Sequence, residues 1–197
     1  DLDRENGHIN VLLSRRVDGI ILSPIQKSIE NIFKIKDRNV PLALFDCKID
    51  GLEADYILVD NESSTMEAVS YLIDLGHKKI VYIGGNPYDL NNRQRFAGYK
   101  NALSLVSISI SDHYVKQGNY TFKHGYEAAT QLLRSDDVPT AFFAANNRIM
   151  LGAYKGIIDC GLQIPDDVSI VGFDDFETAT MLPSPRDLST SRMPSSA

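Results

Sequence analysis

Short, continuous runs of β-branched and aromatic residues recur along the chain and alternate with longer segments of helical period. Such runs are typical of strands that are covered on both faces, as in parallel sheets. Five are clear, at residues 17–22, 40–45, 79–84, 140–144 and 168–173. Shorter runs at 55–59 and 113–116 are two further candidates. The alternation predicts right-handed βαβ units, and therefore an α/β fold built on doubly wound parallel sheets.

The segments between the runs carry start and stop signals for helices. Residues 64–67, Ser-Thr-Met-Glu, have the spacing of a capping box, and Gly76 is placed to end that helix in the left-handed conformation. A second helix is expected around residues 96–103. Thr121 is placed to begin a third helix, and Gly161 to end a fourth. These signals predict that each crossover between strands is a helix.

Composition excludes several classes of protein. The chain has 197 residues, 43% hydrophobic and 23% charged, which is the balance of a globular protein with one domain or two small lobes. No apolar run reaches the roughly 18 residues of a membrane span, so we expect no membrane partner. The net charge of −6 argues against nucleic-acid binding by this chain alone. Two distant cysteines predict neither a disulfide framework nor a zinc site.

Polar residues follow almost every predicted strand. Ligands of open parallel sheets bind outside the carboxyl ends of the strands, so these positions are candidate binding residues. Carboxylates and amides hydrogen-bond to hydroxyl groups, arginine donates a fork of bonds, and an aromatic face stacks on a ring. Each residue alone is also a common turn or cap residue. The candidates include Asp46, Asp60, Asn61, Asn86, Asn91, Arg95, Asn119, Tyr120, Asn146, Asn147, Asp174 and Asp175.

The sequence offers no pattern of a known catalytic site. It contains no GxSxG, HExxH or SxxK motif, and Gly84-Gly85 lacks the spacing of a phosphate-binding loop. We therefore expect a binding protein rather than an enzyme, with no catalytic residues, no cofactor and no metal.

Several motifs, in order along the chain, resemble the lactose/galactose repressor (LacI/GalR) family. They are VDGIIL, VPLALFD, VDN, LGHKKIVYIGG, RFAGYKNAL, VPTAFFAANN and LGAYKGIIDCGLQIPDDVSIVGFDD, within a match from about Val11 to about Pro194. The resemblance implies an effector-binding domain with the fold of type I periplasmic sugar-binding proteins, truncated at both ends. Residues 1–59 would form part of an incomplete N-terminal lobe, 60–182 the C-terminal lobe, and 183–197 a crossover back toward the N-terminal lobe.

The resemblance also implies roles for individual residues. Arg95 matches the arginine that forks onto the effector in many members of the family, and Asn91 matches a polar contact one helical turn earlier. Tyr120 matches an aromatic residue that stacks on the ligand. The remaining matches are an acidic contact of the N-terminal lobe and hydroxyl-binding residues of the C-terminal lobe, namely Asp46, Asn146 and Asp174. Asn147 and Met150 stand where the family usually has Asp and Ala.

The implied protein is a cytoplasmic repressor that acts as a homodimer. A small effector, a sugar in preference to a nucleobase, would bind between two lobes and change the affinity for operator DNA. The DNA would be read by a helix-turn-helix module that is missing from this chain. The alternative is a periplasmic sugar-binding protein of a transporter, which shares the fold.

Overall fold

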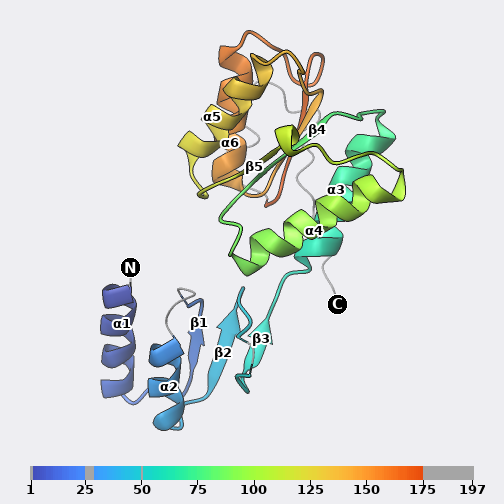
Figure 1. Ribbon diagram of the computed structural model, residues 1–197. Helices are drawn as coiled ribbons and strands as arrows, with labels where there is room; N and C mark the ends of the chain where they lie inside the picture. The colour runs from blue at the N-terminus through green and yellow to red at the C-terminus, as the bar shows by residue number, and fades with distance from the viewer. Residues whose placement is uncertain (1, 25–28, 50, 175–197) are drawn as a thin grey trace. The chain divides into compact units, whose positions relative to one another are not determined.

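The computed structural model describes residues 2–24, 29–49 and 51–174 (Figure 1). The chain divides into two compact units, one of residues 1–60 and one that begins at Asn61. Each unit has its own parallel sheet and its own helices. The α/β class and the parallel sheets predicted from the sequence are therefore confirmed.

The first unit is a three-stranded parallel sheet with two helices. Its strands, in the order β1-β2-β3, are β1 (Ile20–Leu22), β2 (Leu42–Phe45) and β3 (Asp55–Ile57), and its helices are α1 (Leu2–Ser14) and α2 (Ile29–Asp37). Ile9 of α1, Ile20 of β1 and Ile35 of α2 form the buried centre. Both helices therefore contribute to one core with the sheet.

The other face of this small sheet is exposed. Ile21, Phe45 and Ile57 are 72%, 47% and 49% exposed, and each alternates along its strand with a more buried neighbour. A parallel sheet is normally covered on both faces. Among the described residues this unit therefore has one covered face and one exposed face.

Helix α1 was not expected, because its sequence is largely polar. Ile9 is 1% exposed, and Leu13, one turn later, packs against the same cluster. The pair has the i, i+4 spacing of a narrow apolar stripe. This stripe is the only part of the helix that the core requires to be apolar.

The second unit is a doubly wound sheet. Its parallel strands, in the order β5-β4-β6-β7, are β4 (Ile80–Gly84), β5 (Val115–Gln117), β6 (Ala141–Ala144) and β7 (Ser169–Gly172). Helices α3 (Asn61–Asp74) and α4 (Leu90–Leu105) cover one face, and α5 (Phe122–Leu133) and α6 (Asn147–Asp159) cover the other (Figure 1). Every residue of β4 and β6 is buried, because these strands are central and covered on both faces.

Most of the local signals are confirmed. Thr121 is the N-cap of α5, and Gly76 and Gly161 have φ angles of +94° and +81°. The weak run at 113–116 becomes a 3-10 turn over Asp112–Tyr114 followed by β5. The capping-box prediction at 64–67 is wrong, because α3 begins a turn earlier, at Asn61, and includes these residues. Serine and glutamate are tolerated inside a helix, so the pattern alone does not locate its start.

Two further points concern the extent of the structure. The predicted crossover at 183–197 lies outside the described residues. Within the ranges that are described, no helix is both long enough and apolar enough to cross a membrane.

Candidate functional site

The carboxyl ends of β4, β5, β6 and β7 lie at one edge of the second unit, because the four strands are parallel. Asn91 and Arg95 lie on α4, which follows β4, and Tyr120 follows β5. Asn146 follows β6, and Asp174 follows β7. The structure therefore brings five of the six predicted effector residues to the same edge of one sheet.

Asp46 belongs to the first unit and is described separately. It comes directly after β2, its side chain is partly buried, and its backbone N–H donates to the carbonyl of Ile57 at 2.8 Å. Its φ angle is +55°, in the left-handed region. Asp is one of the few non-glycine residues that enter this region readily. Asp46 thus occupies the strand-end position that the sequence predicted.

Arg95 lies at the centre of the second unit's candidate site and is only 7% exposed. Its Nε donates to Oδ1 of Asn61 at 2.8 Å, and its Nη1 donates to the carbonyl of Ala145 at 2.5 Å. Its guanidinium carbon lies 3.7 Å from the centre of the Phe173 ring, a cation–π distance. Ala145 and Phe173 immediately precede Asn146 and Asp174, so Arg95 contacts the ends of both β6 and β7.

Asn61, the first residue of α3, links α3 to α4 through side-chain hydrogen bonds. It is 2% exposed, and its Nδ2 donates to Oδ1 of Asn91 at 3.2 Å and to Oε1 of Gln94 at 3.0 Å. The sequence placed Asn61 among the polar strand-end residues but gave it no role of its own. Its contacts with Asn91 and Arg95 make it part of the site's framework.

Tyr120 lies against the loop between β4 and α4. Its hydroxyl donates to Oδ1 of Asp89 over a long 3.5 Å, and Asp89 is the N-cap of α4. A Cβ added at Gly85 would lie 2.2 Å from the Tyr120 ring, so a side chain there would displace the ring. Sequence reasoning did not identify Asp89, which carries no signal beyond that of a helix cap.

Asn146 and Asp174 each have a local structural role as well. Asn146 is the N-cap of α6, and its Oδ1 accepts a hydrogen bond from the backbone N–H of Ile149 at 2.9 Å. Asp174 is partly buried and has a φ angle of +77°. Two predicted contact residues, Asp46 and Asp174, therefore share a left-handed backbone at a strand end. Unusual backbone conformations of this kind are frequent at binding sites.

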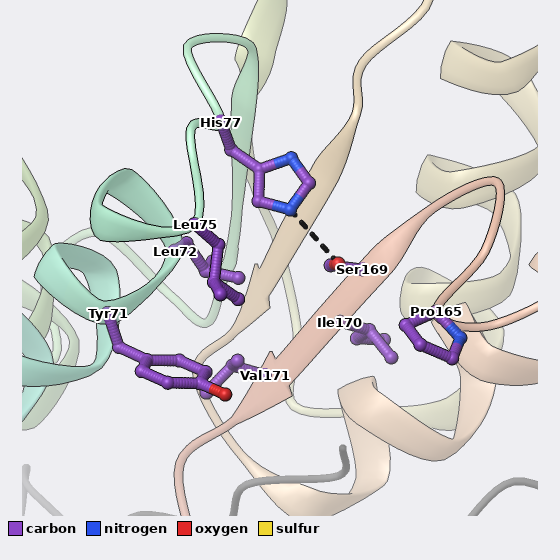
Figure 2. Close-up of a pocket in the computed structure, with 8 residues that line it drawn as sticks. All are labelled: Tyr71, Leu72, Leu75, His77, Pro165, Ser169, Ile170 and Val171. Carbon is purple, nitrogen blue, oxygen red and sulfur yellow. Dashed lines mark hydrogen bonds between the residues drawn. The ribbon is translucent and has the colours of Figure 1, made fainter. Parts of the chain in front are cut away.

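A different concavity, shown in Figure 2, has a volume of about 280 Å³. It lies between the end of α3 and β7 and is lined by Tyr71, Leu72, Leu75, His77, Pro165, Ser169, Ile170 and Val171. The His77 Nε2 lies 3.0 Å from the Ser169 Oγ, and the His77 Nδ1 lies 3.0 Å from the Thr140 Oγ1. None of the predicted effector residues lines this cavity, so it is distinct from the candidate site.

Comparison with known proteins identifies the family of the chain. Residues 69–196 match the periplasmic binding protein-like domain family. The chain is 34% identical over 181 residues to catabolite control protein A of Priestia megaterium, covering 91% of this chain and 54% of that protein. It is 36% identical over 189 residues to the ribose operon repressor of Haemophilus influenzae, covering 94% and 55%. The chain thus spans about half the length of the curated relatives it matches.

A solved structure is similar over most of the chain. It is a LacI family transcriptional regulator from Enterococcus faecium with bound ribose, with a TM-score of 0.77 and 27% sequence identity. The match covers 87% of this chain and 64% of that one.

The parallel sheets, with polar residues at the carboxyl ends of their strands, define an α/β domain of the kind that binds ligands at that edge. The chain belongs to the periplasmic binding protein-like domain family, in the form found in LacI/GalR-type regulators.

Proposed function

We propose that this chain is the ligand-sensing part of a transcriptional repressor. It binds a small effector, a sugar in preference to a nucleobase, at the strand edge that carries Arg95. The observation that supports this most directly is the arrangement around Arg95, which touches the ends of β6 and β7 and the start of α3. Polar groups converging from several strands are typical of a small-molecule site.

The proposed role of each candidate follows from its chemistry. Arg95 and the amides of Asn91 and Asn146 donate hydrogen bonds to ligand oxygens. The carboxylates of Asp46 and Asp174 are acceptors for ligand hydroxyls. Coupling between effector binding and a second site such as operator DNA typically amounts to about 1–3 kcal/mol.

The names of the relatives favour a regulator over a transporter component. Both curated relatives described above are regulators by name, one a catabolite control protein and the other an operon repressor. We propose accordingly that the chain is not an enzyme, that it works in the cytoplasm as part of a homodimer, and that a separate module reads operator DNA. The net charge of −6 fits a sensing part that leaves DNA contact to that module.

The proposal is tested by thermal unfolding in the presence of D-ribose, other pentoses and hexoses, and hypoxanthine. A ligand at about ten times its Kd stabilises the folded state by about 1.4 kcal/mol, which raises the Tm by roughly 3–6 °C for a domain of this size. We expect one of the sugars to raise the Tm and hypoxanthine to leave it unchanged. A shift with hypoxanthine and none with any sugar would contradict the proposed effector class.

Two substitutions on the same helix make the test specific to the site. Arg95→Met removes the buried guanidinium, whereas Arg93→Met removes an exposed one two residues away. We expect Arg95→Met to abolish the ligand-induced rise in Tm and Arg93→Met to retain it. An equal rise in both variants would remove Arg95 from the ligand site.

A further inference from the structure

Asn92 is a buried amide that no sequence motif singles out. Its side chain is 1% exposed and lies in the first turn of α4, between Asn91 and Arg95. Its Oδ1 accepts two hydrogen bonds, from the backbone N–H of Gly85 at 2.8 Å and from the hydroxyl of Tyr82 at 2.9 Å. Its Nδ2 donates to Oε1 of Gln117 at 3.2 Å. Both acceptor positions of the amide oxygen are thus occupied.

These bonds join three elements that meet at the candidate site. Gly85 belongs to the loop after β4, Gln117 ends β5, and Asn92 lies in the first turn of α4. Burial raises the pKa of Tyr82 far above its ordinary value, so its hydroxyl stays protonated and donates to Asn92. The N–H of Gly118 also donates to the carbonyl of Gly85, at 3.2 Å.

The same contacts continue to Tyr120. The ring of Tyr120 lies against Gly85 so closely that a Cβ on Gly85 would be 2.2 Å from it. The hydroxyl of Tyr120 reaches Asp89, and Asp89 accepts from the backbone N–H of Asn92 at 2.9 Å. Asn92, Gly85, Tyr120 and Asp89 therefore form a closed circuit of contacts. Moving Gly85 would move the surface on which the Tyr120 ring rests.

We propose that Asn92 is a positioning residue for the candidate site, an inference that rests on the proposed function. Its side chain holds the Gly85 loop and β5, and through them sets the place of Tyr120 relative to Arg95. Asn92 does not contact the ligand, because its amide is buried and bonded within the protein. Asn92 affects ligand affinity indirectly, by fixing the position of the Tyr120 ring.

The first test needs no ligand. The chain contains no tryptophan, so Tyr120→Trp places a single fluorescent reporter at the site. In that background Asn92→Leu removes all three side-chain bonds, and Asn92→Asp keeps the acceptor for Gly85. Tyr99→Phe is the matched control, because it removes another buried bond of α4, from the Tyr99 hydroxyl to the carbonyl of Ile80 at 2.9 Å.

We expect Asn92→Leu to increase acrylamide quenching of the tryptophan about twofold, Asn92→Asp to increase it less, and Tyr99→Phe to leave it unchanged. Equal quenching in Asn92→Leu and Tyr99→Phe would overturn the inference. If Asn92→Leu does not fold, Asn92→Asp is compared with Tyr99→Phe by the same criterion.

Amide hydrogen exchange at Gly85 and Gly118, with Tyr120 intact, is a second readout. Faster exchange there in Asn92→Leu than in Tyr99→Phe supports the inference, and equal exchange contradicts it.

A calorimetric titration with D-ribose separates this inference from the proposed function. If the parent chain binds ribose, the Asn92→Leu Kd should rise at least about tenfold, whereas Tyr99→Phe should stay within about twofold. Equal Kd changes in the two variants would contradict the positioning role. If the parent chain does not bind ribose, ribose is not the effector. The acrylamide-quenching experiment then tests the positioning role of Asn92 by itself.

Discussion

Arg95 combines a proposed binding role with a structural one. Its hydrogen bonds to Asn61 and Ala145 and its contact with the Phe173 ring join α3, α4 and the ends of two strands. Losing hydrogen bonds of a buried charged group typically costs about 1–3 kcal/mol. Substitution of Arg95 therefore lowers the stability of the ligand-free protein as well. Ligand binding must be judged by the ligand-induced shift in Tm and not by Tm alone.

A second prediction at the residue scale is that the stability of the protein depends on pH through His77. Burial lowers the pKa of His77 below its ordinary value, so the folded state disfavours the protonated ring. The unfolded chain, with a pKa near about 6.5, takes up the proton more readily. The stability that neutral His77 contributes is therefore present above that pH and is lost as the pH falls from it toward the lower folded-state pKa.

Urea unfolding between about pH 5 and pH 8 measures this effect in the parent and in His77→Gln. We expect the difference in free energy of unfolding between the two to be constant above about pH 7 and to shrink as the pH falls. Glutamine still offers a donor and an acceptor to Thr140 and Ser169 but does not titrate. Parallel pH profiles would show that His77 does not contribute in this way.

At the scale of single elements, Asn146 is both a proposed ligand contact and the N-cap of α6, and its contribution as a cap can be measured. Asn146→Ala removes the bond to the N–H of Ile149 and should lower the free energy of unfolding by about 1 kcal/mol. Asn146→Asp keeps an oxygen for the cap and should change stability by less than about 0.5 kcal/mol. Chemical denaturation of both variants measures this. Equal losses would mean that the cap does not stabilise α6.

The pairing of α5 with α6 depends on glycines at their contact. A Cβ on Gly152 would lie 2.0 Å from the carbonyl oxygen of Phe122, and a Cβ on Gly125 would lie 2.1 Å from that of Ile149. Gly152→Ala should therefore destabilise the protein by about 2 kcal/mol, because backbone atoms must move apart.

Gly7 of α1 is the control, since no atom lies within 4 Å of an added Cβ. Alanine favours a helix interior by up to about 1 kcal/mol over glycine, so Gly7→Ala should stabilise slightly. Thermal denaturation followed by circular dichroism compares the two. A neutral or stabilising Gly152→Ala would show that the helices can separate at little cost.

Met150 of α6 is a large side chain that is accommodated between α6 and β7. It is bulkier than the alanine that the resemblance to the LacI/GalR family implies at this position, yet it is 1% exposed. The space comes from Gly172 of β7, where a Cβ would lie 2.3 Å from the Met150 sulfur. The departure noted in the sequence is thus balanced by a glycine on a strand more than twenty residues away.

At the scale of the whole molecule, the two units differ in how completely they are covered. The second has helices on both sheet faces and a continuous buried core, whereas the first exposes Ile21, Phe45 and Ile57. A domain of about 60 residues also buries only about 60% of its unfolded surface. We predict that residues 61–197 fold alone with one cooperative thermal transition and that residues 1–60 do not.

Circular dichroism and the dispersion of amide NMR signals test this prediction on the two fragments. A fragment of residues 61–197 with poorly dispersed signals, or one of residues 1–60 that unfolds cooperatively, would contradict it. The first result would mean that the second unit needs contacts that it does not supply for itself, and the second would mean that residues 1–60 form a sufficient core on their own.

The sequence by itself determined the alternation of strands and helices, the parallel class and the polar positions at strand ends, because periodicity and turn residues report on a few neighbouring residues. Asn61 and Asn92 received no role, since nothing in their own segments distinguishes them from ordinary polar residues. Only the tertiary structure decided the strand order β5-β4-β6-β7. That order brings Arg95 against Ala145 and Phe173, which lie 50 or more residues away along the chain. Such contacts depend on how the crossover helices pack on the sheet, and no local pattern encodes that packing.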